Sequence, residues 1–295
     1  MFRPRSPSLR WAFAALVALL TTPAPGMAQP AAPGPHRVLL TNDNGIEDSK
    51  LVALARAFSP HAETWVVAPA SDRSGYGAHV TLSREPLAVE PRDLGPGIRA
   101  FSVSGSPADA VIVALLDLMR DRLPDLVVSG INGGPNLGGE WMFSGTVGAA
   151  RVAALAGVPS LAVSGLLEDE TPGAPEAAAD WVVRLSTSQL VQELEPPEFL
   201  AVSFPPGTPF DVRGVRVTGR GPLPTVPRLE NAGGRWRMVG ADSTALPVPF
   251  DSDLAAWRDG YIAVVPMRAD EVDHRKLQRW SRPATELPEW RFEGR

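Results

Sequence analysis

Four short polar clusters follow stretches typical of buried strands or precede an expected helix. Their carboxylate, amide and hydroxyl groups are the hard oxygen donors that Mg²⁺ or Mn²⁺ accepts. The last cluster directly precedes the expected helix, whose first amides and dipole favour an anion such as phosphate. A cation site beside an anion site indicates phosphohydrolase chemistry. The clusters are Asn42-Asp43-Asn44-Gly45, Ser71-Asp72-Arg73-Ser74-Gly75, Ser129-Gly130-Ile131-Asn132-Gly133-Gly134-Pro135-Asn136 and Phe143-Ser144-Gly145-Thr146.

Each cluster also has a simpler interpretation when it is taken alone. Asn-Asp-Asn-Gly is a common turn, residues 129–136 form a glycine-rich loop, and Ser144 could serve only as a helix N-cap. Their occurrence in order at successive strand ends favours a single shared site.

Several enzyme classes lack their signatures in this chain. It has no Cys, and none of its 4 His residues forms a pair at metal-ligand spacing. Neither a Gly-x-Ser-x-Gly turn nor a P-loop occurs, which disfavours a serine hydrolase and a nucleoside triphosphatase. The first strand leads into Asn42 instead of a Gly-x-Gly-x-x-Gly fingerprint, which disfavours a dehydrogenase. The net charge of −5 argues against a nucleic-acid binding surface.

The spacing of apolar residues predicts alternating strands and helices. Strand-helix-strand units make the sheet mainly parallel, and continuous apolar strands indicate a sheet covered on both faces. We therefore expect a Rossmann-like, doubly wound α/β fold whose ligands bind at the carboxyl ends of the strands. Expected strands cover residues 37–41, 64–68, 99–103, 125–129, 160–163 and 260–266, and expected helices cover residues 49–58, 107–119, 147–156 and 175–185.

Two later segments differ from this core, which we place at residues 37–270. Residues 206–250 are rich in Pro, Gly and Arg and include an alternating stretch from Val212 to Thr218, so we predict a protruding β-hairpin excursion there. The charged tail at residues 271–295 carries two Trp residues, Trp280 and Trp290. We expect this tail to contribute to a homodimer or homotetramer.

The amino-terminal residues have the pattern of an export signal. Three Arg residues precede an apolar run at residues 11–20, and Gly26-Met27-Ala28 provides small residues at the positions that a signal peptidase reads. The run is too short for a membrane span, which needs roughly 20 residues. We expect a signal peptide at residues 1–28, a flexible lead-in at residues 29–36, and a periplasmic or secreted protein without a membrane anchor after cleavage.

Taken in order, the four clusters resemble the SurE family of survival-protein phosphatases, which are 5′- and 3′-nucleotidases. Gly105-Ser-Pro-Ala-Asp109 adds to the resemblance, which is strong from about residue 37 to 165 and patchy beyond, with a weaker match at Asp253–Tyr261. The resemblance implies a Rossmann-like core with a protruding hairpin and a C-terminal oligomerisation segment. It also implies hydrolysis of nucleoside monophosphates with the help of Mg²⁺ or Mn²⁺.

The resemblance assigns two groups of site residues and leaves one alternative open. The family usually has a second aspartate where this chain has Asn44, so a non-catalytic nucleotide- or phosphate-binding protein of the same fold remains an alternative. Family members are usually cytoplasmic, whereas this chain carries an export signal. The catalytic metal ligands fall on Asp43, Asn44, Ser74 and Asn132, and the phosphate-binding residues fall on Asn136, Ser144, Gly145 and Thr146.

Overall fold

The computed structural model describes residues 37–82, 84–165, 171–223, 228–239 and 247–280. The expected signal peptide, the lead-in and Trp290 lie outside the described residues. No helix in the described part of the chain combines the length and apolar character that a membrane crossing requires.

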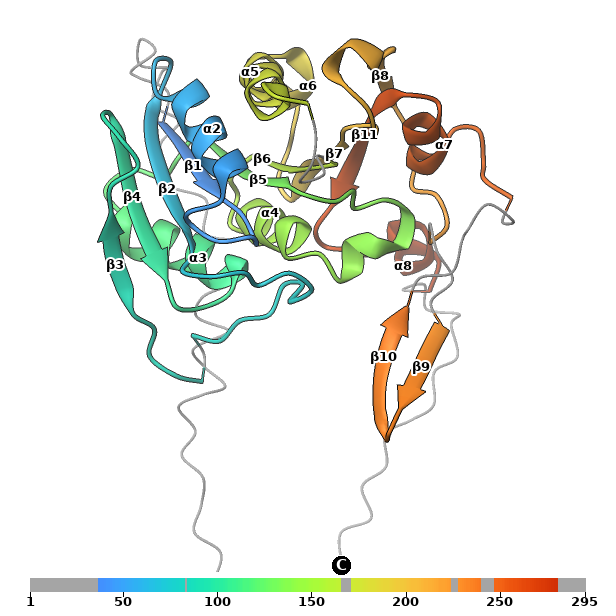
Figure 1. Ribbon diagram of the computed structural model, residues 1–295, viewed down its shortest axis with the longest axis horizontal. Coiled ribbons are helices and arrows are strands. Elements are labelled where there is room, and N and C mark those ends of the chain that lie inside the picture. Colours follow the sequence, from blue (N-terminus) through green and yellow to red (C-terminus); the bar gives the residue numbers. More distant parts are fainter. Residues whose placement is uncertain (1–36, 83, 166–170, 224–227, 240–246, 281–295) are drawn as a thin grey trace, which may run out of the picture.

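A mainly parallel sheet forms the centre of the molecule (Figure 1). Its described strands lie in the order β3-β4-β2-β1-β5-β6-β7-β11-β8, and only the β3–β4 and β7–β11 pairs are antiparallel. The strands are β1 (Arg37–Thr41), β2 (Glu63–Pro69), β3 (Val89–Arg92), β4 (Ile98–Val103), β5 (Leu126–Asn132), β6 (Ser160–Ser164), β7 (Glu198–Ser203), β8 (Gly214–Val217) and β11 (Tyr261–Arg268).

Helices cover both faces of this sheet, as the continuous apolar strands predict. Val38 and Leu40 of β1 pack in one core with α2 and α5, whereas Leu39 packs in a second core with α3 and α4. Alternate side chains of one strand are therefore buried on opposite faces. The helical segments are α2 (Ser49–Phe58), α3 (Pro107–Val113), η1 (Ala114–Leu118), η2 (Gly138–Met142), α4 (Gly145–Leu155), α5 (Ala174–Ser186), α6 (Gln189–Gln192), η3 (Pro209–Asp211), α7 (Asp253–Arg258) and α8 (His274–Trp280).

Local sequence explains where the helices beside the site begin. Asp48 caps α2 by accepting the amides of Lys50 and Leu51. Ser106 and Asp109 form a reciprocal capping box at α3, and Ser144 caps α4 by accepting the amide of Val147. These caps fix the points at which the chain leaves the sheet edge.

The prediction for residues 206–250 was wrong in part. Gly214–Val217, within the alternating stretch, is strand β8 of the main sheet, where it pairs in parallel with β11. The two-stranded hairpin instead comprises β9 (Arg228–Ala232) and β10 (Arg235–Val239), and it projects from the body in Figure 1. Alternate side chains of β8 are exposed because one face of this strand is less covered than the other, and the same alternation is typical of a surface hairpin.

Candidate active site

The candidate site lies where the chain reverses its direction across the sheet. From β1 the chain adds β2 and β4 on one side, then crosses to add β5, β6 and β7 on the other side. The carboxyl ends of β1 and β5 therefore border the switch point at which doubly wound sheets bind ligands. Asp43 follows β1, Asn132 ends β5, and Ser74 lies in the loop after β2.

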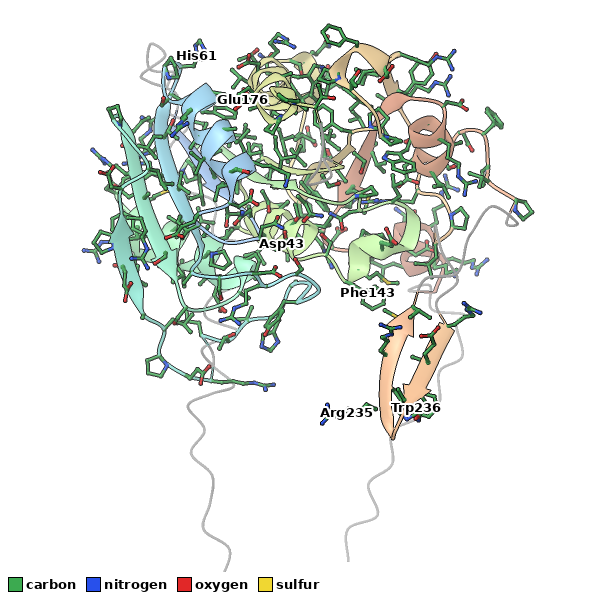
Figure 2. All side chains as sticks on the ribbon, in the orientation of Figure 1. Asp43, His61, Phe143, Glu176, Arg235 and Trp236 are labelled. Carbon is green, nitrogen blue, oxygen red and sulfur yellow. The ribbon has the colours of Figure 1, made fainter. Side chains whose placement is uncertain are left out.

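Asp43 is the buried carboxylate of this site, with 3% of its surface exposed. The hydroxyl of Thr146 donates to its Oδ1 at 2.7 Å, and the Thr146 amide donates to its Oδ2 at 3.2 Å. Figure 2 shows Asp43 at the sheet edge near the start of α4. Burial raises the pKa of Asp43, the hydrogen bonds from Thr146 oppose that rise, and the charge of Asp72 adds to it.

The close approach of α4 to Asp43 requires glycine at position 145. A Cβ atom there would lie 2.8 Å from the Cβ of Asp43 and 3.1 Å from the Cγ of Pro107. Gly148, one turn later, would place a Cβ 2.4 Å from the carbonyl oxygen of Gly77. These glycines therefore let the start of α4 contact both the β1 turn and the loop after β2.

The turn after β1 is closed by Asn42, which was not among the predicted ligands. Its side chain donates to the Gly45 carbonyl at 2.9 Å and accepts the Gly45 amide at 3.1 Å. This pair of bonds fixes the backbone that carries Asp43 and Asn44. The side-chain oxygen of Asn44 is buried and has no hydrogen-bond partner among the described residues.

The loop after β2 contacts Asp43 directly. The Arg73 amide donates to the Asp43 carbonyl at 2.7 Å, which places the neighbouring Ser74 beside the β1 turn. The Ser74 hydroxyl donates to Oδ1 of Asp72 at 2.6 Å, and the Ser74 amide donates to the same oxygen at 2.8 Å.

The segment after β5 supplies amide groups from the other side of the switch point. Asn132 donates from Nδ2 to the Gly134 carbonyl at 2.7 Å, so its oxygen is the side-chain atom that remains available as an acceptor. The backbone amide of Asn136 donates to Ser164 Oγ at 3.3 Å. The side-chain nitrogen of Asn136 is buried without an acceptor in the described part of the chain, as expected for a donor that meets an anion.

The predicted phosphate residues differ in how they are used. Thr146 directs both of its donors to Asp43, so its first role is to hold the carboxylate. The Ser144 oxygen accepts the Val147 amide at 3.1 Å, which confirms its N-cap role and leaves its hydroxyl proton available. Gly145 begins α4, and its amide has no intrahelical acceptor.

A divalent cation fits this donor set. Asp43 provides a carboxylate oxygen, and Asn132 and Ser74 provide neutral oxygens. The buried side-chain oxygen of Asn44 accepts no hydrogen bond from the described residues, and a cation bound there would take the place of the missing donor. Within the described ranges, no group of three or more His, Cys, Asp and Glu side chains is placed to hold a metal. Neutral oxygens therefore make up most of the predicted ligand set.

Two buried carboxylates outside the site hold the loops that line it. Asp109 accepts the amides of Thr81 and Leu82, each at 3.0 Å, and so anchors the loop that carries Ser74. Asp253 accepts the Gly138 amide at 2.9 Å and pairs with Arg220 at 3.1 Å.

The Arg220–Asp253 pair acts on the segment that carries Asn136. Arg220 donates to the Asn136 carbonyl at 2.6 Å, and burial lowers the pKa of this guanidinium while Asp253 opposes the change. The Ser106-x-x-Asp109 spacing signals a capping box in the sequence. No local pattern signals Arg220, because its partners are distant in the chain.

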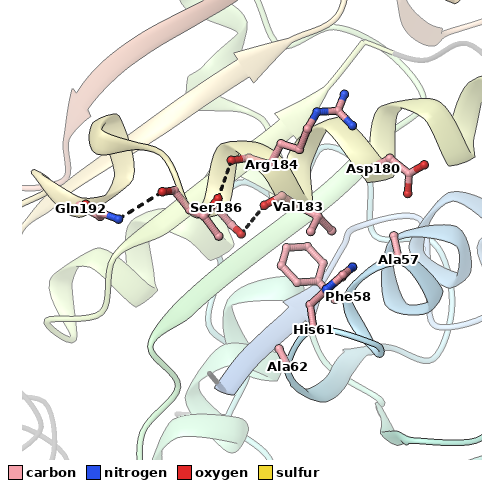
Figure 3. A pocket seen from close by; sticks show the side chains of 10 residues that line it. Ala57, Phe58, His61, Ala62, Asp180, Val183, Arg184, Ser186 and Gln192 are labelled. Carbon is pink, nitrogen blue, oxygen red and sulfur yellow. Dashed lines mark hydrogen bonds between the residues drawn. The ribbon is translucent and has the colours of Figure 1, made fainter. Parts of the chain in front are cut away.

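A cavity of about 770 Å³ lies apart from this site (Figure 3). Its lining includes Phe58 and His61 at the end of α2 and just after it, and Arg184 and Thr187 at the end of α5 and just after it. Both helices return toward the start of the next strand, so the cavity lies at the amino ends of the strands. The candidate active site lies at the opposite edge.

A doubly wound sheet with oxygen donors and a helix start at its switch point is the architecture of a metal-assisted phosphohydrolase. The chain belongs to the SurE family, whose model, described as Survival protein SurE, matches residues 38–223. Membership of this family implies dependence on a divalent metal.

Several known proteins are similar over most of the chain. The 5′-nucleotidase SurE 1 of Burkholderia lata is 37% identical over 256 residues, covering 82% of this chain and 94% of that protein. The 5′-nucleotidase SurE of Alkaliphilus metalliredigens is 34% identical and covers 82% of this chain and 96% of that protein. The crystal structure of the SurE protein from Aquifex aeolicus has a TM-score of 0.69 at 27% identity, covering 82% of this chain and 97% of that one.

Proposed function

We propose that this protein is a metal-dependent phosphomonoesterase that hydrolyses nucleoside monophosphates to nucleoside and phosphate. The observation that carries the proposal is a buried carboxylate, Asp43, together with an unpartnered acceptor on the neighbouring Asn44 and an unpartnered donor on Asn136 in the segment after β5. The acceptor suits a cation and the donor suits a phosphate oxygen. The names of the similar proteins, which are 5′-nucleotidases, support the same reaction.

In this proposal Asp43, Asn44, Ser74 and Asn132 hold Mg²⁺ or Mn²⁺. When bound, the cation neutralises charge on the phosphoryl oxygens and lowers the pKa of water. Asn136 donates from its side-chain amide to the phosphate, together with the Gly145 amide and the Ser144 hydroxyl. Thr146 contributes by orienting Asp43 and by favouring its ionised form, because both of its hydrogen bonds lower the pKa of this carboxyl against the rise caused by burial.

The direct test measures phosphate release from AMP by the purified protein, with EDTA and with added Mn²⁺ or Mg²⁺. We expect activity only with the metal and a loss of activity in Asp43→Asn. Asp48→Asn is a matched control, because the Asp48 side chain accepts the amides of Lys50 and Leu51 at the start of α2 and an asparagine can cap the helix in the same way. A protein that binds AMP but releases no phosphate with either metal would support the non-catalytic alternative, which the neutral Asn44 favours.

We also propose that the enzyme is exported to the periplasm or secreted, and that it works as a homodimer or homotetramer. The Arg-rich start, the short apolar run and the Gly26-Met27-Ala28 site support export. Mass spectrometry of the exported protein should find Gln29 as its first residue. Soluble cytoplasmic protein that retains Met1 would contradict this proposal.

A further inference from the structure

Asp72 lies against the turn that carries the predicted metal ligands. The adjacent Arg73 amide bonds to the Asp43 carbonyl at 2.7 Å. A Cβ atom on Gly45 would lie 3.2 Å from the Ser71 carbonyl carbon and 3.5 Å from the Asp72 nitrogen, so these two backbone segments are packed together. Asp72 is therefore a neighbour of the site, although its side chain is exposed.

The predicted ligands contain little negative charge. Asp43 is ionisable, whereas Asn44, Ser74 and Asn132 are neutral. A single carboxylate opposes only half the charge of a divalent cation, and a charged oxygen attracts such an ion more strongly than a dipole does. A second carboxylate beside the ligands would strengthen the site without replacing any of them.

The hydrogen bonds of Ser74 give Asp72 a specific part in the site. A serine hydroxyl has one proton to donate and two lone pairs to offer. The Ser74 proton is directed to Asp72 at 2.6 Å, so the lone pairs of Ser74 face away from Asp72 and are available to a cation. The Ser74 amide donates to the same carboxylate oxygen at 2.8 Å and holds this geometry. Such outer carboxylates orient metal ligands and make them better donors.

We propose that Asp72 is the second carboxylate of the metal site: it positions Ser74 as a ligand and supplies the negative charge that Asn44 does not. This inference rests on the proposed function, because it takes the cation site as given. Asp72 is a positioning residue, so its effect should be seen in metal affinity before it is seen in turnover.

The test measures Mn²⁺ binding to the purified protein from the electron paramagnetic resonance signal of free Mn²⁺, without substrate. Asp72→Asn keeps an oxygen that can accept from Ser74 and removes the charge. We expect its dissociation constant for Mn²⁺ to rise about 10–100-fold, the usual effect of losing an outer-shell partner. Asp48→Asn is the matched control, since Asp48 also accepts two backbone amides, those of Lys50 and Leu51, and its substitution should leave Mn²⁺ binding unchanged.

Two further variants separate the two parts of the inference. The Asp72→Asn substitution should weaken Mn²⁺ binding less in the Ser74→Ala variant than in the wild type. The reason is that the effects of two substitutions are not additive when one residue acts through the other. Adding Asn44→Asp to Asp72→Asn should restore Mn²⁺ affinity, because the number of carboxylates returns to two. Melting temperatures in EDTA should match the wild type for each variant and so exclude misfolding.

The outcomes distinguish this inference from the proposed function. A wild type that binds Mn²⁺ and an Asp72→Asn variant that binds it equally well would overturn the role of Asp72 alone. A wild type that binds neither Mn²⁺ nor Mg²⁺ would overturn the metal site and this inference together. Fully additive effects of Asp72→Asn and Ser74→Ala would overturn the coupling through Ser74.

Discussion

The Thr146 side chain donates a hydrogen bond to the Asp43 carboxylate, although the two residues lie 103 positions apart in the sequence. We predict that Thr146→Val lowers activity at limiting Mn²⁺ while the protein remains folded. The valine keeps the volume and the backbone amide but loses the hydroxyl bond at 2.7 Å. A hydrogen bond to a charged group is worth about 1.5–3 kcal/mol, so the Mn²⁺ concentration for half-maximal activity should rise roughly ten- to hundredfold.

Thr146→Ser provides the control for this prediction, because it keeps the hydroxyl and loses only a methyl group. Its Mn²⁺ requirement should stay near that of the wild type. An equal Mn²⁺ requirement in the valine variant and the wild type would show that the bond to Asp43 does not support metal binding.

Glu140, in η2, has a raised pKa because of its burial, and the charge of Asp253 raises that pKa further. A folded pKa above the ordinary value of 4.5 means that the folded protein binds this proton more tightly than the unfolded chain does. Ionised Glu140 therefore reduces stability at neutral pH, and this penalty is relieved as the pH falls toward 4.5.

We predict that Glu140→Gln raises the melting temperature at pH 7–8 and that the gain disappears as the pH falls to about 4.5 or below. Thermal melts across this range measure the effect. Glu85→Gln, on an exposed loop, removes the same charge and serves as the control. A glutamine variant that is less stable than the wild type at neutral pH would contradict the prediction.

At the residue scale, the sequence predicted which polar residues would gather at one edge of the sheet, but not which hydrogen bonds each would make. Asp43, Ser74, Asn132 and Ser144 lie at one edge of the sheet because parallel strands end together, which strand order along the chain predicts. The use of Thr146 to hold Asp43 was not predicted. It depends on a contact between α4 and the β1 turn that no local pattern encodes.

At the scale of elements, the loop from Ala70 to Leu82 owes its position to Asp109. Oδ1 of this buried carboxylate accepts the amides of Thr81 and Leu82, and Oδ2 accepts the amides of Thr81 and Ser106. The Ser106 hydroxyl donates to the His79 carbonyl, which ties the same loop to the start of α3. The loop that carries Ser74 is thus fixed from outside the site.

We predict that Asp109→Asn costs about 1–3 kcal/mol of unfolding free energy, because an amide nitrogen would face backbone N–H donors that both carboxylate oxygens now accept. It should also raise the Mn²⁺ requirement by loosening Ser74. Urea denaturation and metal titration of activity measure the two effects.

The comparison variant is Asp211→Asn, in the exposed capping box that Asp211 of η3 forms with the N-cap residue Thr208. It alters the same type of motif away from the site, so the Mn²⁺ requirement should not change. Loss of stability in Asp109→Asn without any change in Mn²⁺ requirement would limit Asp109 to a role in folding.

The spacing of apolar residues predicted the elements whose positions depend on local burial. It did not predict elements whose positions depend on pairing with a strand distant in the sequence. The strand β1 and the helix α2 have the residues expected, because buried apolar positions recur at the spacing of each element. By contrast, β8 was assigned to the hairpin excursion. Its place in the sheet depends on pairing with β11, which follows it after more than forty intervening residues.

At the scale of the whole molecule, the hairpin of β9 and β10 leaves apolar side chains uncovered. Met238 lies opposite Leu229, and Trp236 lies two residues from Met238, so all three share one face of the hairpin. Their exposed fractions are 70% for Met238, 65% for Leu229 and 66% for Trp236. A two-stranded hairpin is only marginally stable alone, and such a face is typical of an interface.

We predict that the protein is a homodimer or homotetramer in which this apolar face and the tail containing α8 contact another copy. Light scattering at micromolar concentration should give a multiple of the monomer mass. Replacing Trp236 and Met238 together by Ser should lower that mass, because both side chains would leave the interface. Arg235→Ser is the matched control, since Arg235 lies next to Trp236 in β10 and its side chain points to the other face (Figure 2). Deleting residues 270–295 should also shift the protein toward monomer, and a wild type that is already monomeric would refute the prediction.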